Sequence, residues 1–108
     1  MFSVFHCAAA RGQYECLETL LNENANIWLR SRRGEFPIHE AFSNDHLDCV
    51  DLFIDKCDAR KVCNSANIYD GTSILHLAAA ANNLRLCKRL VENGADMHAL
   101  MKTSKVRD

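Results

Sequence analysis

Apolar residues recur along this chain in two alternating patterns, and each pattern predicts a short helix. One pattern combines a histidine with apolar and small residues, at 3–9, 36–42 and 73–79. The other follows at a nearly constant distance and has the i, i+3, i+4 spacing of an amphipathic helix. Its three copies are Cys16-Leu17 with Leu20-Leu21, Cys49-Val50 with Phe53-Ile54, and Leu86-Cys87 with Leu90-Val91. The chain is therefore predicted to form three pairs of short helices.

The spacing of the three histidines gives the period of a repeat. His6 and His39 are 33 residues apart, and His39 and His76 are 37 apart. Neither helix of a pair could bury its apolar face alone, so similar units must stack side by side. We predict an all-α repeat solenoid with units at residues 1–33, 34–70 and 71–108, and with Leu20 and Leu90 facing inward.

The second unit is longer than the first, and the extra residues fall between Ile54 and His76. We place this four-residue insertion within residues 58–65. An insertion between elements is expected to lengthen a connecting loop without changing the helices around it.

On these residues the sequence resembles the ankyrin repeat family, whose signature Thr-Pro-Leu-His-x-Ala-Ala is matched loosely by the three histidine segments. The resemblance covers nearly the whole chain. Only Pro37 keeps the signature proline, which Val4 and Ile74 replace, and Phe42 stands where the family has a small alanine. Since Val4 and Phe5 do not form a polar terminal cap, we expect the chain to continue into further repeats.

The resemblance implies stacked helix-turn-helix repeats joined by β-hairpin fingers. The helix-to-helix turns would lie at Arg11-Gly12-Gln13, Asp45-His46 and Asn82-Asn83, and the finger tips at Arg33-Gly34 and Asp70-Gly71. It also implies a structural role for His6, His39 and His76, each of which would bond to the backbone and tie a finger to a helix.

Neither a metal centre nor a catalytic site is expected. The three histidines would lie in units stacked about 10 Å apart, whereas the ligands of one ion all lie within about 2 Å of it. Cys7 adjoins His6 in sequence, but neighbours on a helix point about 100° apart. The sequence contains no CxxC pair, glycine-rich phosphate loop or GxSxG motif. We expect no enzyme, no cofactor and no metal.

The six cysteines are expected to be reduced thiols of an intracellular protein, cytoplasmic or nuclear. Cys16, Cys49 and Cys87 lie in apolar helical stretches, where cysteine behaves as a small buried hydrophobe. Cys57 and Cys63 are expected in an exposed loop without an assigned role, a redox-sensing pair being the alternative. No apolar run approaches the ~20 residues of a membrane span, and the start lacks the features of a signal peptide.

The net charge is only −1, yet the charges are unevenly distributed. Basic residues concentrate in the predicted fingers: Arg30, Arg32, Arg33, Arg60, Lys61, Lys102, Lys105 and Arg107. Acidic residues gather around the second helices: Glu15, Glu18, Asp45, Asp48, Asp51 and Asp55. In an ankyrin-like stack this distribution gives a basic concave rim and an acidic convex back. The rim is either simply solvated or attracts an acidic peptide, phosphoprotein or lipid head group.

Aromatic residues in the fingers suggest where a partner binds. Trp28 lies near arginines at a position where the family favours a small polar residue, so we expect an exposed binding hot spot there. Tyr69 is a lesser candidate. The candidate partner-binding residues are Trp28, Arg30, Arg32, Arg33, Tyr69, Arg60 and Lys61. Nucleic acid is not expected, because the net charge is near zero and no known reading helix is present.

These observations favour a protein–protein interaction scaffold or adaptor that binds a partner protein, possibly through an acidic segment, on its fingers and first helices. One alternative is the cytosolic ankyrin array of a membrane protein such as a transient-receptor-potential-type ion channel. Apolar runs of about 20 residues beyond residue 108 would favour that alternative. Another is a substrate-receptor or signalling subunit whose effector domain lies outside these residues.

Overall fold

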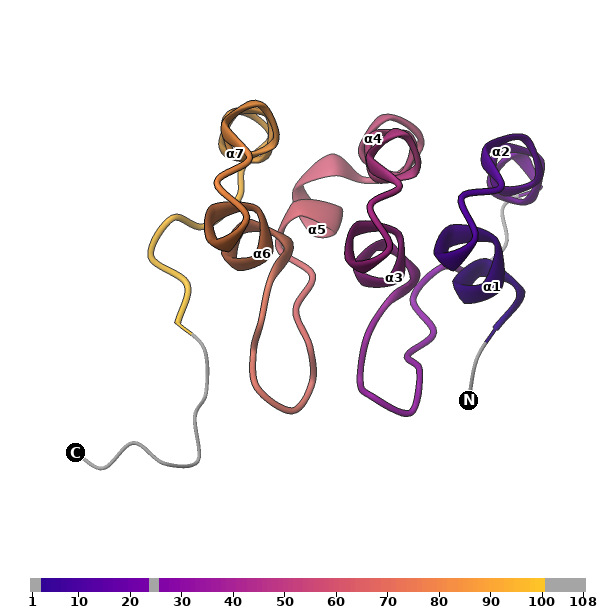
Figure 1. Cartoon of the computed structure of the whole chain (residues 1–108), viewed down its shortest axis with the longest axis horizontal. Helices are drawn as coiled ribbons and strands as arrows, with labels where there is room; N and C mark the ends of the chain where they lie inside the picture. Colours follow the sequence, from indigo (N-terminus) through magenta and orange to yellow (C-terminus); the bar gives the residue numbers. More distant parts are fainter. Residues whose placement is uncertain (1–2, 24–25, 101–108) are drawn as a thin grey trace.

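The computed structural model describes residues 3–23 and 26–100, and within these ranges it consists of seven helices joined by turns and loops. The helices are α1 (Val4–Ala10), α2 (Tyr14–Asn22), α3 (Pro37–Ser43), α4 (Leu47–Lys56), α5 (Ala59–Cys63), α6 (Ile74–Ala80) and α7 (Leu84–Glu92). Figure 1 shows three helix pairs side by side, α1 with α2, α3 with α4 and α6 with α7. The all-α repeat solenoid expected from the sequence is confirmed.

The repeated histidine motif caps the first helix of a pair. The backbone N–H groups of His6 and His76 donate to the hydroxyl oxygens of Ser3 and Ser73, each at 3.2 Å. The N–H of each serine donates in return to Nδ1 of the same histidine, at 3.1 and 3.0 Å. α3 begins instead with Pro37, whose missing N–H costs nothing at the first helical position. These local contacts explain why each first helix starts where the motif predicts.

The turns inside the three pairs share one residue with left-handed backbone. Gly12, Asp45 and Asn82 have φ angles of 68°, 64° and 55°. Glycine adopts this conformation without a steric penalty, and Asp and Asn tolerate it better than other residues. The interpretation of the two turns without glycine is thus confirmed.

The core runs along the stack between the two layers of helices. Its largest fully buried side chains on the second helices are Leu17, Phe53, Leu86 and Leu90. The inward position predicted for Leu90 is confirmed, whereas Leu20 is only half-buried against the core.

Phe42, the bulky replacement for the family's alanine, is accommodated locally. Its side chain is half-buried and packs against the same core.

The extra residues of the second unit form a helix, so the expectation of a longer loop is wrong. The N–H of Lys61 donates to the side chain of Asp58, which caps the start of α5. Val62 and Cys63 are each only 1% exposed. A cap followed by an apolar pair is enough to fix one short helix when tertiary packing supports it. Figure 1 places α5 between the second and third helix pairs.

Asn64, directly after α5, fastens this helix to the third unit. Its side-chain amide donates to the carbonyl of Gly94 at 3.0 Å, and its amide oxygen accepts from the N–H of Asp96 at 2.8 Å. Both partners lie in the loop that follows α7. The inserted helix therefore connects the second and third units.

The fingers are the connections at residues 26–36, the first finger, and 66–73, the second finger. Both turn back on themselves like hairpins, but in the described part of the chain they contain no β-strand. One isolated bridge joins Ala66 and Ser73. The expected β-hairpins are therefore hairpin-shaped loops in these two connections.

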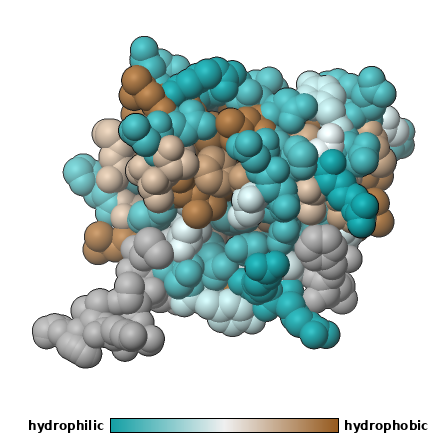
Figure 2. All heavy atoms as spheres, viewed as in Figure 1, coloured by the Kyte–Doolittle hydropathy of each residue, from teal (hydrophilic) through white to brown (hydrophobic). Residues whose placement is uncertain are grey.

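No described helix has both the length and the apolar character that crossing a bilayer requires. Figure 2 shows the face seen in Figure 1, where hydrophilic atoms cover much of the surface and apolar atoms gather toward the end formed by α6 and α7.

Candidate protein-binding surface

The two fingers are hydrogen-bonded to each other. The side-chain amide of Asn67 donates to the carbonyl of Arg33 at 2.8 Å, and the N–H of Ile68 donates to the carbonyl of Gly34 at 3.1 Å. Each bond joins the tip of the first finger to the second finger. The tips therefore form one connected platform rather than two independent loops.

Arg30 links the two fingers behind their tips. Its guanidinium Nη1 donates to the carbonyls of Gly34 at 3.0 Å and of Ala66 at 2.8 Å, and its Cζ lies 4.1 Å from the ring centroid of Phe36. Charge-assisted hydrogen bonds to two fingers and contact with an aromatic face occupy much of this side chain. These contacts give Arg30 a structural role, and the partner-binding role expected from its sequence position stays a prediction.

Trp28 is half-buried, so the expectation of an exposed tryptophan is wrong. Its ring meets that of Phe36 edge to face, with centroids 5.2 Å apart and planes at 88°. The ammonium of Lys61 lies 4.7 Å from the Trp28 ring centroid. The covering lysine comes from the inserted helix, which the sequence pattern did not predict.

Arg60 and Lys61 belong to α5 and not to a finger. Lys61 covers Trp28, and the side chain of Arg60 lies beside Gly94 in the loop after α7. Both residues were expected to line the finger surface, and the structure places both on the inserted helix instead.

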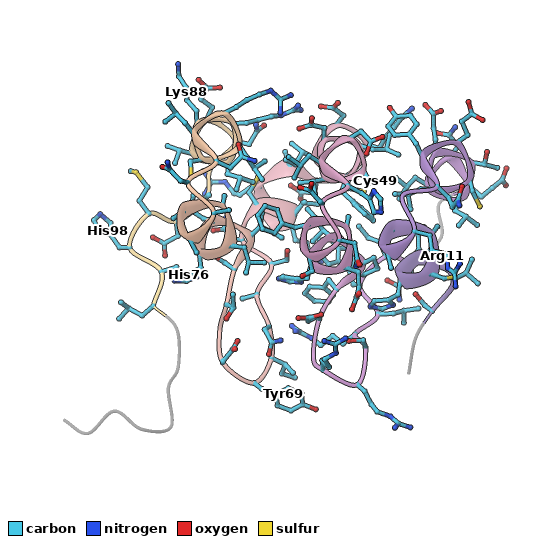
Figure 3. The ribbon with its side chains drawn as sticks, in the orientation of Figure 1. Arg11, Cys49, Tyr69, His76, Lys88 and His98 are labelled. Carbon is cyan, nitrogen blue, oxygen red and sulfur yellow. The ribbon has the colours of Figure 1, made fainter. Side chains whose placement is uncertain are left out.

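The exposed finger tips bring together three of the predicted residues. Arg32, Arg33 and Tyr69 are all exposed, and Figure 3 shows Tyr69 at the tip of the second finger. The sequence prediction missed Ile68, which is 49% exposed beside Tyr69. Both of these side chains approach Gly34 so closely that a β carbon there would clash with them. We call Arg32, Arg33, Ile68 and Tyr69 the finger-tip patch.

The carboxylates of Glu35 and Asp70 reduce the net positive charge at the fingers. Burial and a hydrogen bond to Glu40 raise the pKa of Glu35, while nearby Arg33 lowers it. The pKa of Asp70 is held below its usual value by hydrogen bonds from Thr72, whose N–H lies 2.9 Å from the carboxylate. The rim is thus mixed in charge, because Asp70 and Glu35 lie next to the finger tips that carry the exposed Arg32 and Arg33.

The acidic back of the molecule carries ion pairs between neighbouring units. Asp51 on α4 accepts from Arg85 at 3.0 Å and from Arg89 at 3.1 Å, and Arg89 also pairs with Asp55. Exposed pairs contribute little individually, but a network of this kind adds more. Asp51 is therefore part of the junction between α4 and α7, and not an inert surface residue.

Comparison with known proteins agrees with this architecture. A family model described as ankyrin repeats in three copies matches residues 5–100. The chain belongs to the ankyrin repeat family. It is 32% identical over 92 residues to Ankyrin repeat and SOCS box protein 3 of Bos taurus. The aligned stretch covers 85% of this chain and 17% of that protein. It is also 32% identical over 96 residues to human NF-kappa-B inhibitor alpha, and that alignment covers 87% of this chain and 30% of the relative.

The chain thus spans less than a third of the length of either relative.

The histidines of the ankyrin motif link helices to the loops beside them. Nδ1 of His6 and of His76 accepts a backbone N–H, so the ring proton lies on Nε2. Nε2 then donates to the carbonyl of Glu35 at 2.9 Å in the first case and of Ala99 at 3.1 Å in the second. This is the geometry that the resemblance implies for both residues.

His39, the ankyrin histidine of the second unit, differs from the other two. Its Nδ1 accepts the N–H of Phe36 at 3.1 Å, but its buried Nε2 has no hydrogen-bond partner among the residues that the structure describes. Burial lowers the pKa of His39 to about 4. Within residues 3–23 and 26–100 no three His, Cys, Asp or Glu side chains are grouped so that they could hold a metal ion.

Three expectations for the cysteines of this ankyrin stack are wrong. Cys16 was expected in the core and is exposed on α2, while Cys63 was expected in an exposed loop and is buried in α5. Cys57 was expected in the same exposed loop and is half-buried at the C-cap of α4. Cys63 is buried because the inserted segment is a packed helix. Cys16 is exposed because the outer face of α2 has no neighbour in the described structure.

We expect Cys7 and Cys16 to react first with a maleimide in the native protein, and Cys49 and Cys63 last. Burial raises the pKa of both Cys49, to about 11, and Cys63, so their reactive thiolates are scarce as well as shielded. A time course followed by peptide mass spectrometry measures the order. All six thiols should react once the chain is denatured, and native labelling of Cys63 as fast as Cys7 would mean that α5 is not packed as described.

Proposed function

We propose that this chain is a protein-interaction module, a scaffold or adaptor whose partner binds the finger-tip patch together with the exposed side of the first helices. Ankyrin repeats are protein-interaction modules, and the chain belongs to that family. One observation carries the choice of surface. The fingers are bonded to each other through Asn67 and Arg33, so their tips are ordered before a partner arrives. Preorganisation of this kind lowers the entropic cost of binding.

The chemistry of the patch favours a partner segment that places an acidic group beside an apolar side chain. Arg32 and Arg33 can bind a carboxylate or phosphate, while Ile68 and Tyr69 offer apolar contact beside them. Since Glu35 lies near Arg33, a long uniformly acidic segment fits less well. We propose no catalytic step, no cofactor and no nucleic acid for this surface.

The substrate-receptor or signalling alternative is favoured by a specific observation. One relative is named for ankyrin repeats together with a SOCS box, and another is named as an inhibitor of NF-kappa-B. By analogy, the repeats described here would hold a protein target for an effector domain encoded elsewhere. An intracellular location, cytoplasmic or nuclear, is proposed on the same analogy.

Two substitutions at the finger tips should weaken partner binding in different ways. Arg32→Glu should slow association and flatten its salt dependence, because charges at an interface rim act mainly on encounter rates. Tyr69→Ala should speed dissociation, with a loss of about 2 kcal/mol if the ring is a hot spot. Partners captured from cell lysate by the native chain would be identified by mass spectrometry and their binding kinetics measured on each variant.

Asp48→Asn is the matched control on the back, because asparagine keeps the oxygen that accepts the N–H of Cys49. Trp28→Ala does not serve as a binding probe, since it removes packing against Phe36. If the Asp48 variant loses the partner while both finger-tip variants keep it, the partner uses the opposite surface and the proposed site is wrong.

A further inference from the structure

The two tyrosines of this chain, Tyr14 and Tyr69, lie in opposite environments. Tyr69 is 68% exposed at the tip of the second finger, where Figure 3 shows it. Tyr14 is 38% exposed at the start of α2. Burial raises the pKa of its hydroxyl, and the negative charges of Glu18, Asp48 and Asp55 raise it further. A negative group on Tyr14 would therefore meet acidic neighbours, whereas the finger tips carry exposed arginines.

The exposure of Tyr69 follows from its place in the finger. It precedes Gly71 by two residues, as Arg32 precedes Gly34 in the first finger. Both glycines have left-handed backbone, with φ angles of 75° and 76°. Arg32 is exposed even though the second finger is hydrogen-bonded to the first. A neighbouring finger thus leaves this position of the tip accessible.

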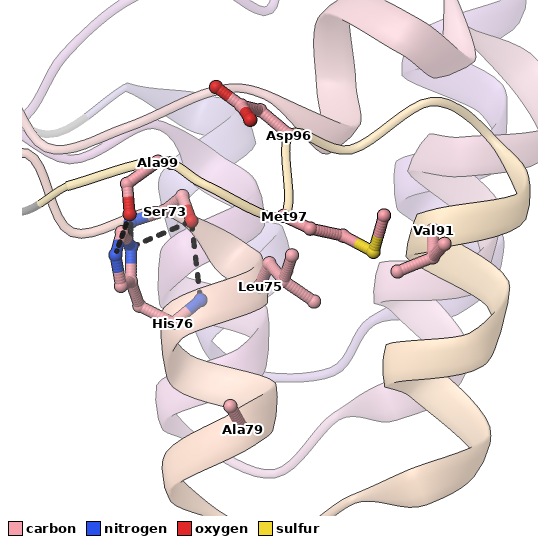
Figure 4. A pocket seen from close by; sticks show the side chains of 8 residues that line it. All are labelled: Ser73, Leu75, His76, Ala79, Val91, Asp96, Met97 and Ala99. Carbon is pink, nitrogen blue, oxygen red and sulfur yellow. Dashed lines mark hydrogen bonds between the residues drawn. The ribbon is translucent and has the colours of Figure 1, made fainter.

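The second finger is fixed both at its base and near its tip. At the base, Ser73 and His76 exchange capping hydrogen bonds at 3.0 and 3.2 Å (Figure 4). Near the tip, Oδ1 of Asn67 accepts the N–H of Tyr69 at 2.8 Å, and its Nδ2 donates to the carbonyl of Arg33 at 2.8 Å. Tyr69 therefore has a defined place relative to the first finger.

The ring of Tyr69 lies against the tip of the first finger. A β carbon at Gly34 would come within 2.7 Å of its Cδ2 and 2.9 Å of its Cε2. Cε2 is only two bonds from the hydroxyl oxygen, and Gly34 directly follows Arg33. The hydroxyl of Tyr69 is thus close to the backbone of Arg33 and within reach of its long side chain.

The two carboxyl groups near the finger tips have hydrogen-bond partners of their own. The carboxylate of Asp70 accepts the N–H of Thr72 at 2.9 Å, and the carboxyl group of Glu35 is hydrogen-bonded to Glu40. Both arginines of the first finger tip are exposed. Their guanidinium groups are therefore accessible to a stronger acceptor such as a phosphate.

We propose that Tyr69 is a phosphorylation site and that Arg32 and Arg33 of the same chain bind its phosphate. The enzyme is a protein tyrosine kinase and the phosphate donor is ATP. The phenolic oxygen attacks the γ-phosphorus, the new O–P bond forms as the bond to ADP breaks, and the phenolic proton passes to the base of the kinase. A phosphate opposite arginines forms charge-assisted hydrogen bonds that order the segment carrying it.

Phosphorylation would cancel most of the charge of the finger-tip patch. Arg32 and Arg33 contribute two positive charges, and a phosphotyrosine carries about −1.5 to −2 at neutral pH. The arginines that hold the phosphate are also those that would hold the acidic group of a partner. Phosphorylation therefore closes the patch, a consequence that rests on the proposed function, whereas the phosphate site itself does not.

The first test is a phosphorylation time course on the purified native chain, with a tyrosine kinase that phosphorylates a peptide of residues 65–74. Tyr69 should be modified about tenfold faster than Tyr14 or more, because Tyr14 must leave α2 to enter an active site. Peptide mass spectrometry measures both rates, and Tyr69→Phe should lose the faster one. A native chain that is not modified at Tyr69, or is modified as fast at Tyr14, overturns the proposal.

The second test follows the phosphorus NMR resonance of the phosphorylated chain through a pH titration. Its midpoint should lie at lower pH than that of the phosphorylated 65–74 peptide, because arginines favour the dianion. The peptide also contains Asp70, so the difference isolates the first finger. Arg32→Ala and Arg33→Ala should each move the midpoint back toward the peptide. Arg11→Ala, the control at an exposed arginine after α1, should leave it unchanged.

A midpoint equal to that of the peptide, or one insensitive to both finger-tip arginines, shows that the phosphate is not bound and overturns the proposal. Partner binding gives a separate answer. If the phosphate is bound but the phosphorylated chain binds its partner as tightly as the native chain, the partner does not use the finger-tip patch, and only the proposed function is wrong. If the phosphate is not bound while Arg32→Glu weakens partner binding, the proposed function stands and the phosphate site is wrong.

Discussion

Leu90→Asp is expected to unfold the chain. Leu90 is 0% exposed and belongs to the main core cluster. A carboxylate at this position would have no partner there, and burying such a group costs several kcal/mol. The whole stability of a small domain is only about 5 to 15 kcal/mol. Far-UV circular dichroism of the variant should show loss of most helical signal at room temperature.

Leu84→Asp is the control for this experiment. Leu84 begins the same helix and is 76% exposed, and an acidic residue in the first turn is favourable to the helix. This variant should keep its helical signal and its melting temperature within a few degrees. Should Leu90→Asp remain fully helical, the register of α7 in the core is wrong.

Stability is expected to fall by about 3 kcal/mol between pH 7 and pH 4 because of His39 alone. Its pKa is lowered from 6.5 to about 4, chiefly by burial, so the unfolded chain binds the proton more readily than the folded one. The contribution of neutral His39 to the free energy of unfolding is therefore fully present above pH 6.5 and is lost as the pH falls toward 4. Urea unfolding at a series of pH values measures the slope.

The contribution of His39 is isolated by comparison with His39→Gln, in which this part of the slope should disappear even if overall stability is lower. The raised pKa of Glu35 acts in the opposite direction, and the lowered pKa of Asp70 acts only at more acidic pH. An identical slope in the native chain and His39→Gln would contradict the assignment.

The repeat architecture could be predicted because its causes are local in sequence. A histidine recurs three residues after a capping serine or two residues after Pro37, and an apolar stripe follows it in each unit. Each of these features acts within a few residues of itself. The burial of Leu90 followed from the same period. Features with short-range causes were therefore predicted correctly.

The surface was harder to predict because it depends on contacts between distant residues. α5 is too short to show a periodic pattern, and its position depends on Asn64 reaching the loop after α7. Trp28 is covered by Lys61 from that same helix. Arg32, Arg33 and Tyr69 are exposed at the finger tips, whereas the hydrogen bonds of Arg30 to Gly34 and Ala66 could not be predicted from spacing.

The inserted helix has a consequence for how the stack melts. In a linear array each unit is stabilised by its interfaces with neighbouring units. The units unfold in one cooperative transition only if every such interface is strong enough. The first junction is direct, with α1 against α3 and α2 against α4. At the second junction α3 contacts α6 and α5 packs against α4, while the ion pairs of Asp51 join α4 to α7. Salt screens ion pairs that are partly exposed to solvent. High ionic strength should therefore turn a single melting transition into two, with the third unit unfolding first.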